Sequence, residues 1–254
     1  NVFFLATYCF YALFSILLSF PLGVYAVIPN GIIFLSVIPV IYTQTTGHKI
    51  REIFSLRMPS FKNVLLVVLG SICVLVVAQF IANIAVKIYE LFGKIPKPQI
   101  NLETKPALIA LQVFMAGLLI PVLEETFFRG YVLGMFRRVK LKHYVILSGV
   151  LFGLFHLQIH VVFGTIFAGI VWGYFVKYSG SLDSGMIGHI LFNSITVALM
   201  HYKARLKSVM NGDTVKSMQT QGLVIYFGVV VLAGLIIYFV LKTMKKDYDK
   251  LDET

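Results

Sequence analysis

Charged residues and cysteines are both scarce in this sequence. Charged residues make up 13% of its 254 residues, about half the share of roughly 25% that soluble domains carry. This low charge, together with 58% hydrophobic residues, excludes a disordered or fibrous chain, because disordered chains are poor in hydrophobic residues. The two cysteines, Cys9 and Cys73, lie inside hydrophobic runs, which excludes a disulfide-stabilised secreted scaffold.

Acidic residues are half as numerous as basic ones. The chain has 11 Asp and Glu against 22 Lys and Arg, and a formal net charge of +11. In a soluble protein this excess would indicate a nucleic-acid partner. Here the basic residues lie in short loops between hydrophobic runs, where they set membrane topology and contact anionic lipid headgroups. We therefore expect a lipid bilayer as a partner and no nucleic acid.

Long hydrophobic runs dominate the chain, and the mean hydropathy is +0.87. Most runs approach or exceed the roughly 20 residues that a helix needs to cross a bilayer. They cover about residues 3–28, 30–47, 62–91, 106–136, 143–158, 160–178, 184–200 and 221–242. The sequence therefore predicts an all-α, polytopic membrane protein of about eight transmembrane helices, built as a single transmembrane domain over residues 1–254.

Two glycine pairs with helical spacing predict close helix contacts within this bundle. Gly149 and Gly153 form one GxxxG pair, and Gly169 and Gly173 form another. Since glycine lets helix backbones approach closely in lipid, packing is the expected role of both pairs.

Lysine and arginine are distributed unevenly among the predicted loops. The loops at 48–62, 137–142 and 177–183 and the tail from 242 contain 13 of them, whereas the loops at 87–105 and 201–218 contain eight. The positive-inside rule therefore predicts that the N- and C-termini are both cytoplasmic. Lysine outnumbers arginine 16 to 6, a bias typical of AT-rich prokaryotic genomes, so we expect a prokaryotic cell membrane.

Two adjacent acidic residues, Glu124 and Glu125, lie inside a hydrophobic run. A charge at mid-bilayer costs about 2.5–3.5 kcal/mol on insertion scales, so both carboxylates need compensation. Arg129 follows Glu125 by four residues and shares its helix face, which makes an intrahelical ion pair available. Glu124 points about 100° away around the helix, so it need not share that partner and is free for chemistry. The alternative is that the cluster is an ion-paired packing node.

Two further polar pairs with helical spacing occur in later hydrophobic runs. Phe152 and His156 are four residues apart, as are His189 and Asn193. Each pair can simply hydrogen-bond a neighbouring helix. Convergence of all three groups would instead create an intramembrane polar pocket with a carboxylate base, an imidazole and donors for an oxyanion. Such a set is sufficient for adding water to a peptide carbonyl.

In order along the chain, the three groups match the EExxxR, FxxxH and HxxxN motifs of a known family. The sequence resembles the CAAX-protease and bacteriocin-processing (CPBP, or Abi) family of intramembrane proteases, which is related to the type II CAAX prenyl endopeptidases. All three motifs are complete and lie between residues 124 and 193, within a motif-bearing core at about 106–200. The resemblance implies an intramembrane endopeptidase that cleaves a prenylated CAAX-type peptide, a bacteriocin or signal-peptide precursor, or a membrane protein.

The resemblance also implies a role for each motif residue. Glu124 would be the general base that activates the attacking water, and His156 would help to position that water. His189 and Asn193 would stabilise the oxyanion. Glu125 and Arg129 would support the site, with Glu125 also able to assist the base.

One glutamate and two histidines also resemble a catalytic zinc set, in which Glu124, His156 and His189 would be the ligands. The sequence contains no HExxH motif, which is the strongest zinc signature, and asparagine is a poor zinc ligand. We therefore expect a glutamate-type mechanism without a metal, and no organic cofactor.

Two other functions would use the same polar residues. A membrane scaffold or immunity protein would bind a peptide in the pocket without cleaving it, and it would tolerate the loss of Glu124. A proton-coupled transporter would use the glutamates and histidines as a relay. Such transporters are typically built from internal repeats, and the sequence contains none.

Overall fold

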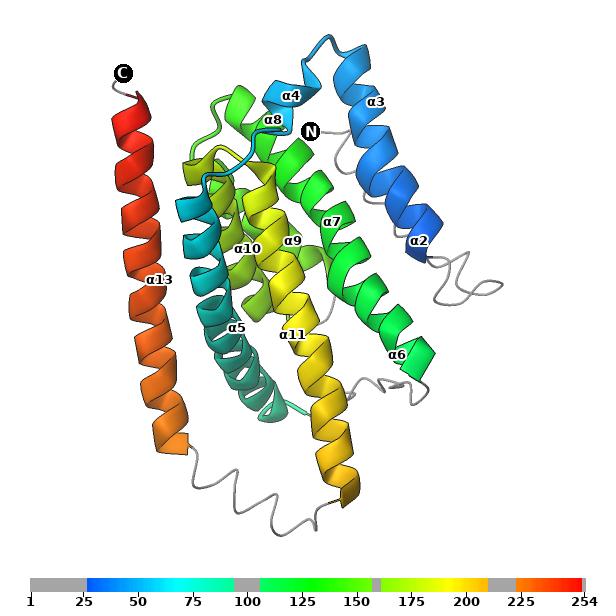
Figure 1. Cartoon of the computed structure of the whole chain (residues 1–254), viewed down its shortest axis with the longest axis vertical. Helices are drawn as coiled ribbons and strands as arrows, with labels where there is room; N and C mark the ends of the chain where they lie inside the picture. The colour runs from blue at the N-terminus through cyan, green and yellow to red at the C-terminus, as the bar shows by residue number, and fades with distance from the viewer. Residues whose placement is uncertain (1–26, 94–105, 157–160, 210–222, 253–254) are drawn as a thin grey trace.

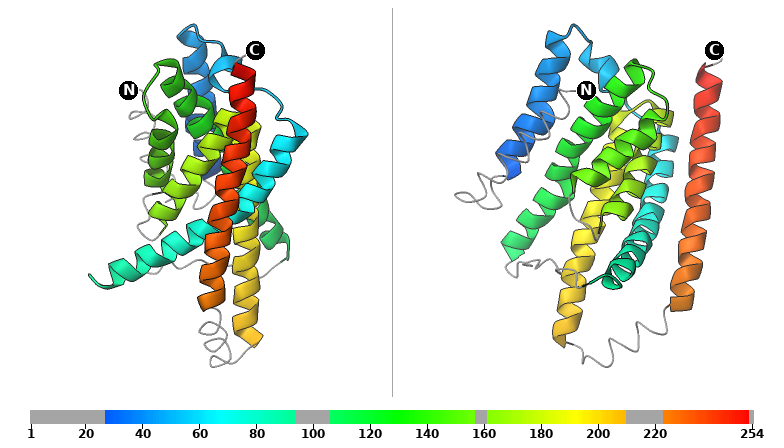
Figure 2. Two further views of the ribbon diagram at one scale, coloured as in Figure 1. Left: turned by 90° about the vertical axis from the view of Figure 1, so that its left-hand side faces the viewer. Right: turned by 180° about the vertical axis from the view of Figure 1, so that it is seen from behind.

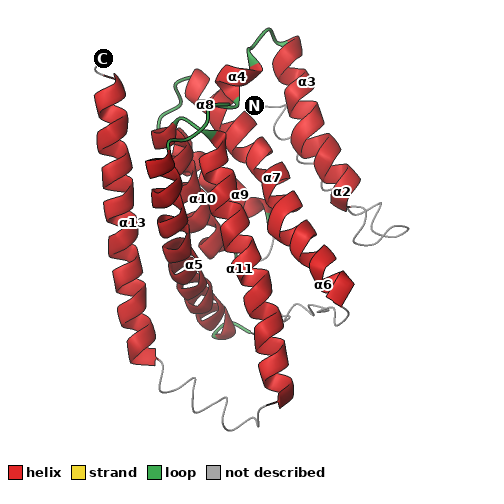
Figure 3. Cartoon of the chain, viewed as in Figure 1, coloured by secondary structure: helices red, strands yellow, loops and turns green. Residues whose placement is uncertain are grey.

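The computed structural model describes residues 27–93, 106–156, 161–209 and 223–252. Within these four stretches every regular element is a helix and there is no strand (Figure 3), so the predicted all-α class is confirmed. The first predicted span, at 3–28, lies outside the described residues except for its last two positions, and so does Cys9.

The helices follow one another along the chain as shown in Figure 1. The first described helices are α2 (Val27–Asn30), the π-helical stretch η2 (Gly31–Val37), α3 (Ile38–Thr45), α4 (Ile50–Ile53) and α5 (Phe61–Glu90). The next series is α6 (Pro106–Gln112), η3 (Val113–Leu119), α7 (Ile120–Glu125), η4 (Thr126–Val132) and α8 (Leu133–Arg138). The last are α9 (Tyr144–Phe155), α10 (Val162–Ser179), α11 (Leu182–Val209) and α13 (Leu223–Asp252).

Five of the described helices are long and apolar enough to cross a membrane, which makes the chain a multi-pass membrane protein. They are Phe61–Glu90, Ala107–Arg138, Val162–Ser179, Leu182–Ala204 and Ile225–Leu251. Two further apolar helices, Gly31–Thr45 and Tyr144–Phe155, are shorter, in keeping with the short run at 143–158. The predicted count of eight is not reached within the described residues.

Two predicted loop boundaries are wrong. The hydrophobic run at 184–200 was expected to end in a loop at 201–218, but α11 continues to Val209. The tail expected from 242 is likewise helical, because α13 continues to Asp252. Both extensions lack glycine and proline and are rich in lysine, which has a high helix propensity. Hydropathy marks where a helix leaves the apolar layer and not where the helix ends.

The glutamates of the first motif lie on one continuous helix, Ala107–Arg138, that runs from α6 through α8. Two seven-residue π-helical stretches, η3 and η4, interrupt its α-helical hydrogen bonding on either side of α7. Pro121 is the second residue of α7, and proline has no backbone N–H to donate. Since π-helical turns within α-helices are frequent at functional sites, the surroundings of α7 are a candidate site.

The contact between α9 and α10 depends on glycines from both helices. A Cβ added at Gly149 would lie 2.6 Å from the Ile170 backbone nitrogen, and one added at Gly169 would lie 3.0 Å from the Gly149 carbonyl oxygen. Gly153 and Gly173, one turn along, meet the facing helix at similarly short distances. The predicted packing role of both GxxxG pairs is therefore confirmed.

Three helices, α5, α10 and α11, contact one another at the centre of the bundle. Helix α9 packs on α10, and α11 also contacts η3 and α7. Two outer elements flank this centre: α13 packs on α5 and α10 at one edge, and η2 contacts α7 and η4 at the opposite edge (Figures 1 and 2). The glutamate-bearing helix is thus held against α11, which carries the HxxxN motif.

The segments predicted to be cytoplasmic gather at one end of the bundle. The α3–α4 turn, the start of α5, the ends of α8 and α13 and the α10–α11 turn all lie at the top in Figure 1. Lys62 Nζ pairs with Asp247 Oδ2 at 2.6 Å across this end, and Arg137 Nη1 donates to Ser55 Oγ at 3.1 Å. This grouping agrees with the uneven distribution of basic residues. The cytoplasmic orientation of this end stays a prediction.

Candidate active site

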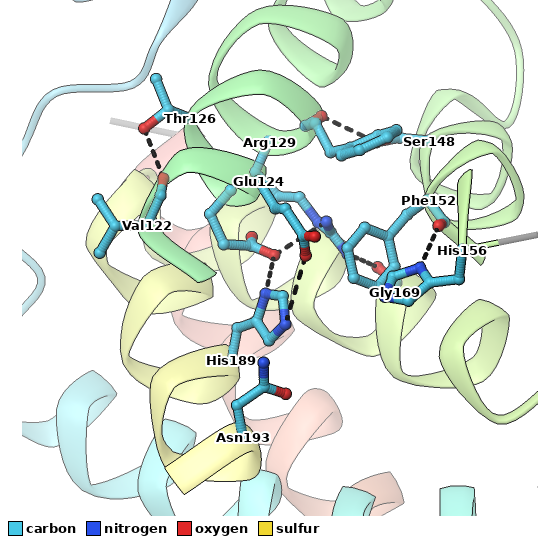
Figure 4. A network of polar contacts seen from close by, with 12 residues as sticks. Val122, Glu124, Thr126, Arg129, Ser148, Phe152, His156, Gly169, His189 and Asn193 are labelled. Carbon is cyan, nitrogen blue, oxygen red and sulfur yellow. Dashed lines mark hydrogen bonds and ion pairs between the residues drawn. The ribbon is translucent and has the colours of Figure 1, made fainter. Parts of the chain in front are cut away.

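Four polar side chains of the predicted pocket meet in the interior of the bundle (Figure 4). Glu124 and Glu125 lie on α7, Arg129 lies on η4, and His189 lies on α11. All four residues are buried. Two of the three sequence motifs, 60 or more residues apart in the chain, therefore contribute to one polar cluster.

Glu125 and Arg129 form the ion pair that their spacing predicted. Arg129 Nη1 lies 2.9 Å from Glu125 Oε1, and neither side chain has exposed surface. The guanidinium also donates from Nη2 to the Gly169 carbonyl at 3.0 Å, and its Cζ lies 4.2 Å from the centre of the Phe152 ring. A buried charge is tolerated when it is paired and hydrogen-bonded, and here Arg129 has a carboxylate, a carbonyl and an aromatic face.

His189 joins the two carboxylates from the facing helix. Its Nδ1 lies 3.1 Å from Glu125 Oε1, and its Nε2 lies 3.8 Å from Glu124 Oε2. Because a carboxylate accepts and a ring N–H donates, Nδ1 carries the proton in the hydrogen bond to Glu125. The other ring nitrogen is thereby directed at Glu124 (Figure 4).

Glu124 has a different environment from its neighbour. No ion pair joins it to Arg129 among the described residues, and its nearest charged or ionisable partner is His189 at 3.8 Å, which is beyond hydrogen-bond distance. Its side chain keeps 10% of its surface exposed. The helical spacing indicated that Glu124 need not share the arginine of Glu125, and the structure agrees. The carboxylate lies at the edge of the cluster.

Asn193 lies one turn beyond His189 on α11 but bonds a different part of the motif helix. Its Nδ2 donates to the Ala116 carbonyl at 3.0 Å, and the adjacent Ser194 donates from Oγ to the Gly117 carbonyl at 3.3 Å. Both carbonyls belong to η3, just before Pro121. One of the two amide hydrogens of Asn193 is thus used within the protein, and the second makes no hydrogen bond to the residues that the structure describes.

His156, the histidine of the second motif, follows the last residue of α9. Its Nδ1 is hydrogen-bonded to the Phe152 carbonyl of its own helix at 3.0 Å, and its ring packs edge-on against the Phe152 ring at 4.9 Å. No hydrogen bond or ion pair joins it to Glu124 or His189 in the described part of the chain. The structure therefore brings His156 next to Phe152 but not into the carboxylate cluster.

Two aromatic residues fix the orientation of the His189 ring. Trp172 on α10 stacks on it with a centroid distance of 4.4 Å and an interplanar angle of 21°, and Phe152 meets it edge-on at 5.4 Å and 90°. Trp172 is almost fully buried. Phe152 was predicted only as part of a motif, and Trp172 was not predicted at all. The one available signal for Trp172 was that it is the single tryptophan of the chain.

Glycines on α11 allow this helix to approach the cluster. A Cβ added at Gly185 would lie 2.6 Å from Glu125 Oε2, and one added at Gly188 would lie 2.9 Å from Trp172 Cδ1. Sequence reasoning missed both glycines. Gly185 lies four residues before His189 and so shares its helix face, which is the signal that could have identified it.

A catalytic zinc site uses three protein ligands around one ion. Of the three ligands that the sequence predicted, Glu124 and His189 approach each other, whereas His156 bonds its own helix. Within residues 27–93, 106–156, 161–209 and 223–252, no three His, Cys, Asp or Glu side chains are grouped so that they could hold a metal ion. The three predicted ligands as arranged therefore do not fit a zinc site.

Comparison with known proteins identifies the motif-bearing part of the chain. Residues 106–195 match the family described as type II CAAX prenyl endopeptidase Rce1-like. Neither the curated proteins nor the solved structures contain a match to the chain. The matched segment includes all three motifs and both helices of the polar cluster. The family model that residues 106–195 match agrees with the resemblance that the three motifs predicted.

Proposed function

We propose that the protein is an intramembrane endopeptidase that hydrolyses a peptide bond in a membrane-associated substrate. The family match supports a protease. One geometric observation supports hydrolysis at this cluster: Arg129 neutralises Glu125 at 2.9 Å, whereas Glu124 approaches only the His189 ring, at 3.8 Å, among the described residues. A carboxylate without a cationic partner is available as a general base.

The proposed nucleophile is a water molecule held between Glu124 and His189. A gap of 3.8 Å lets one water oxygen lie within hydrogen-bonding distance of both Glu124 Oε2 and His189 Nε2. With its Nδ1 proton donated to Glu125, the neutral ring presents a lone pair at Nε2, so the water donates one hydrogen to each residue. Its oxygen is then free to attack a carbonyl carbon.

The proposed reaction moves one proton through Glu124. As the water oxygen forms a bond to the substrate carbonyl carbon, Glu124 takes the water proton and the carbonyl oxygen becomes an oxyanion. Collapse of the tetrahedral intermediate re-forms the carbonyl and breaks the C–N bond. Glu124 then gives its proton to the leaving amine, which restores the carboxylate.

The proposed oxyanion donors are those that the family pattern implies. Asn193 has one amide N–H that is not used by Ala116. In the doubly protonated form of His189, Nε2 is a donor to the oxyanion as well, and the water is then held by Glu124 alone. His156 has an Nε2 atom that its bond to Phe152 leaves available, so we retain it as a residue that contacts water or substrate. Glu125 and Arg129 support the site by holding His189.

We further propose a glutamate-type mechanism without a metal and without an organic cofactor. Candidate substrates are a prenylated CAAX-type peptide, a bacteriocin or signal-peptide precursor, and a membrane protein. Glu124 lies 14 residues before Arg138, the last residue of its helix, or about 21 Å along the axis. We propose that the site opens toward this basic end, that the end and both termini are cytoplasmic, and that the membrane is prokaryotic.

The test is a comparison of peptide termini in membranes that contain the wild-type protein or Glu124→Gln at matched expression. The substitution keeps the size of the side chain and removes its ability to accept a proton. Termini present with wild type and absent with Glu124→Gln are the expected result, and they would identify substrate and cleavage site together. Glu52→Gln is the matched control, because the Glu52 side chain is exposed and pairs with Lys49 on the surface.

The competing function is a membrane scaffold or immunity protein that binds a peptide in the same pocket. It predicts identical termini in all three membranes, and it predicts that the biological function survives Glu124→Gln. A folded Glu124→Gln protein with unchanged termini would therefore contradict the protease proposal and favour the scaffold.

A further inference from the structure

We infer that Asn193, beside its proposed oxyanion role, is a positioning residue: it replaces a backbone hydrogen bond that Pro121 cannot make and so holds the helix that carries Glu124. Its effect on catalysis rests on the proposed protease function. The hydrogen-bond replacement itself does not.

The hydrogen-bond register before Pro121 shows which acceptor lacks a backbone donor. The Ile120 N–H donates to the Met115 carbonyl, five residues back, which is the π-helical pattern. In the same pattern the Ala116 carbonyl would accept from the N–H of residue 121. Residue 121 is proline and has no N–H. The Ala116 carbonyl therefore has no backbone donor in this register, although it lies within a membrane-spanning helix.

The missing donor is supplied from α11. Asn193 Nδ2 donates to the Ala116 carbonyl at 3.0 Å. The next residue, Ser194, donates to the Gly117 carbonyl at 3.3 Å, which is the acceptor that residue 121 would use in the α-helical pattern. The Ala116 and Gly117 carbonyls, to which a backbone N–H at position 121 would donate, thus both accept a hydrogen bond from a side chain in the same turn of α11.

A glycine makes this close contact possible. A Cβ added at Gly117 would lie 2.8 Å from Ser194 Oγ and 3.3 Å from Ser194 Cα. Any larger residue at 117 would push α11 away and lengthen the hydrogen bond from Asn193. The glycine at 117, the proline at 121 and the two donors at 193–194 therefore belong to one helix–helix contact.

This contact sets the geometry of the proposed catalytic pair. Glu124 lies three residues after Pro121, and His189 lies one turn before Asn193 on α11. Each of the two helices therefore carries one proposed catalytic residue and one half of the Asn193–Ala116 bond. Loss of that bond lets the two helices shift relative to each other, which changes the 3.8 Å separation of Glu124 and His189.

A double-mutant cycle between Asn193→Ala and Pro121→Ala tests the inference, because Pro121→Ala restores the backbone N–H. The measurements are thermal unfolding in detergent and turnover of a membrane-associated reporter peptide, with kcat and KM determined separately. Asn193→Ala should lower the unfolding temperature and reduce kcat by about tenfold or more, since an unsatisfied carbonyl is left in an apolar interior. Pro121→Ala alone should change both quantities little.

The decisive variant is the double substitution, which should regain most of the unfolding temperature and only part of the kcat that Asn193→Ala loses, because the proposed oxyanion N–H of Asn193 stays absent. Pro39→Ala serves as the matched control, because Pro39 also lies in the first turn of an apolar helix that follows a π-helical stretch, whereas Asn193 bonds the helix of Pro121. Pro39→Ala combined with Asn193→Ala should recover nothing.

Two results would overturn the inference. One is a double variant as unstable as Asn193→Ala, which would mean that the Ala116 carbonyl does not need the donor. The other is recovered stability with no recovery of kcat at all, which would mean that Asn193 affects catalysis only through the reacting atoms and not through the helix. If the wild-type protein cleaves no reporter at all, the proposed function fails, while the unfolding temperatures still decide whether Asn193 replaces the missing bond.

Discussion

Glu125 pairs with Arg129 at 2.9 Å with no exposed surface on either side chain, while Glu124, its neighbour in the chain, pairs with no lysine or arginine among the described residues. Adjacent residues on a helix point about 100° apart, so the arginine can serve one carboxylate only. The second carboxylate faces a histidine and keeps contact with the surface. We therefore propose separate tasks for these two chemically identical residues, one structural and one in proton transfer.

Removal of the arginine should destabilise the whole bundle. Arg129→Leu leaves the buried Glu125 without a cation, and breaking a buried ion pair in this way costs about 3–5 kcal/mol. The stability of Arg129→Lys should lie between those of the wild type and Arg129→Leu. Lysine keeps the charge but loses the planar donors that reach both Glu125 and Gly169. Denaturant unfolding in detergent measures the difference. A wild-type unfolding midpoint in Arg129→Leu would contradict a stabilising role.

Chelation should leave activity unchanged. The predicted zinc ligands do not form a three-residue group in the described part of the chain, and the proposed water is activated by Glu124. Turnover of the reporter peptide is compared before and after prolonged treatment with a tight zinc chelator. Inhibition that is reversed by added zinc would show that the metal-free mechanism is wrong.

An added methyl group at Gly185 should disturb the cluster directly. The Cβ of Gly185→Ala would lie 2.6 Å from Glu125 Oε2, so α11 or the carboxylate must move, and overpacking of this kind costs about 1–3 kcal/mol. Both unfolding temperature and turnover are expected to fall. Gly234→Ala on α13 is the control, because a Cβ there meets nothing within 4 Å; it should be neutral or slightly stabilising. Equal behaviour of the two variants would contradict the close approach of α11.

Intrinsic fluorescence should report on the His189 ring. Trp172 is the single tryptophan of the chain, and it stacks on His189 at 4.4 Å. His189→Leu removes the stacked ring and should change the emission intensity and wavelength. His201→Leu lies on the same helix, where His201 is bonded to Gln112, and it should leave the emission unchanged. Emission that is the same in wild type and His189→Leu would contradict the stacked arrangement.

Much of the helix inventory could be predicted because hydropathy and helical spacing are local properties. Most of the predicted runs that lie in the described residues coincide with a helix, although α11 and α13 extend beyond their apolar parts. The ion pair of Glu125 and Arg129 could be predicted because the four-residue spacing places both side chains on one face. The sequence did not predict that α9 would end at Phe155, which leaves His156 bonded to its own helix.

By itself, the sequence determined the membrane class, the three motifs and the pairing within each helix, since all of these depend on residues a few positions apart. Only the tertiary structure decided which residues meet across helices. His189 bonds Glu125 from 64 positions away, and Asn193 bonds Ala116 from 77 positions away. Such contacts depend on the rotation and separation of packed helices, which are set by glycines such as Gly185 and by the missing N–H of Pro121, and neither effect has a periodic pattern along the chain.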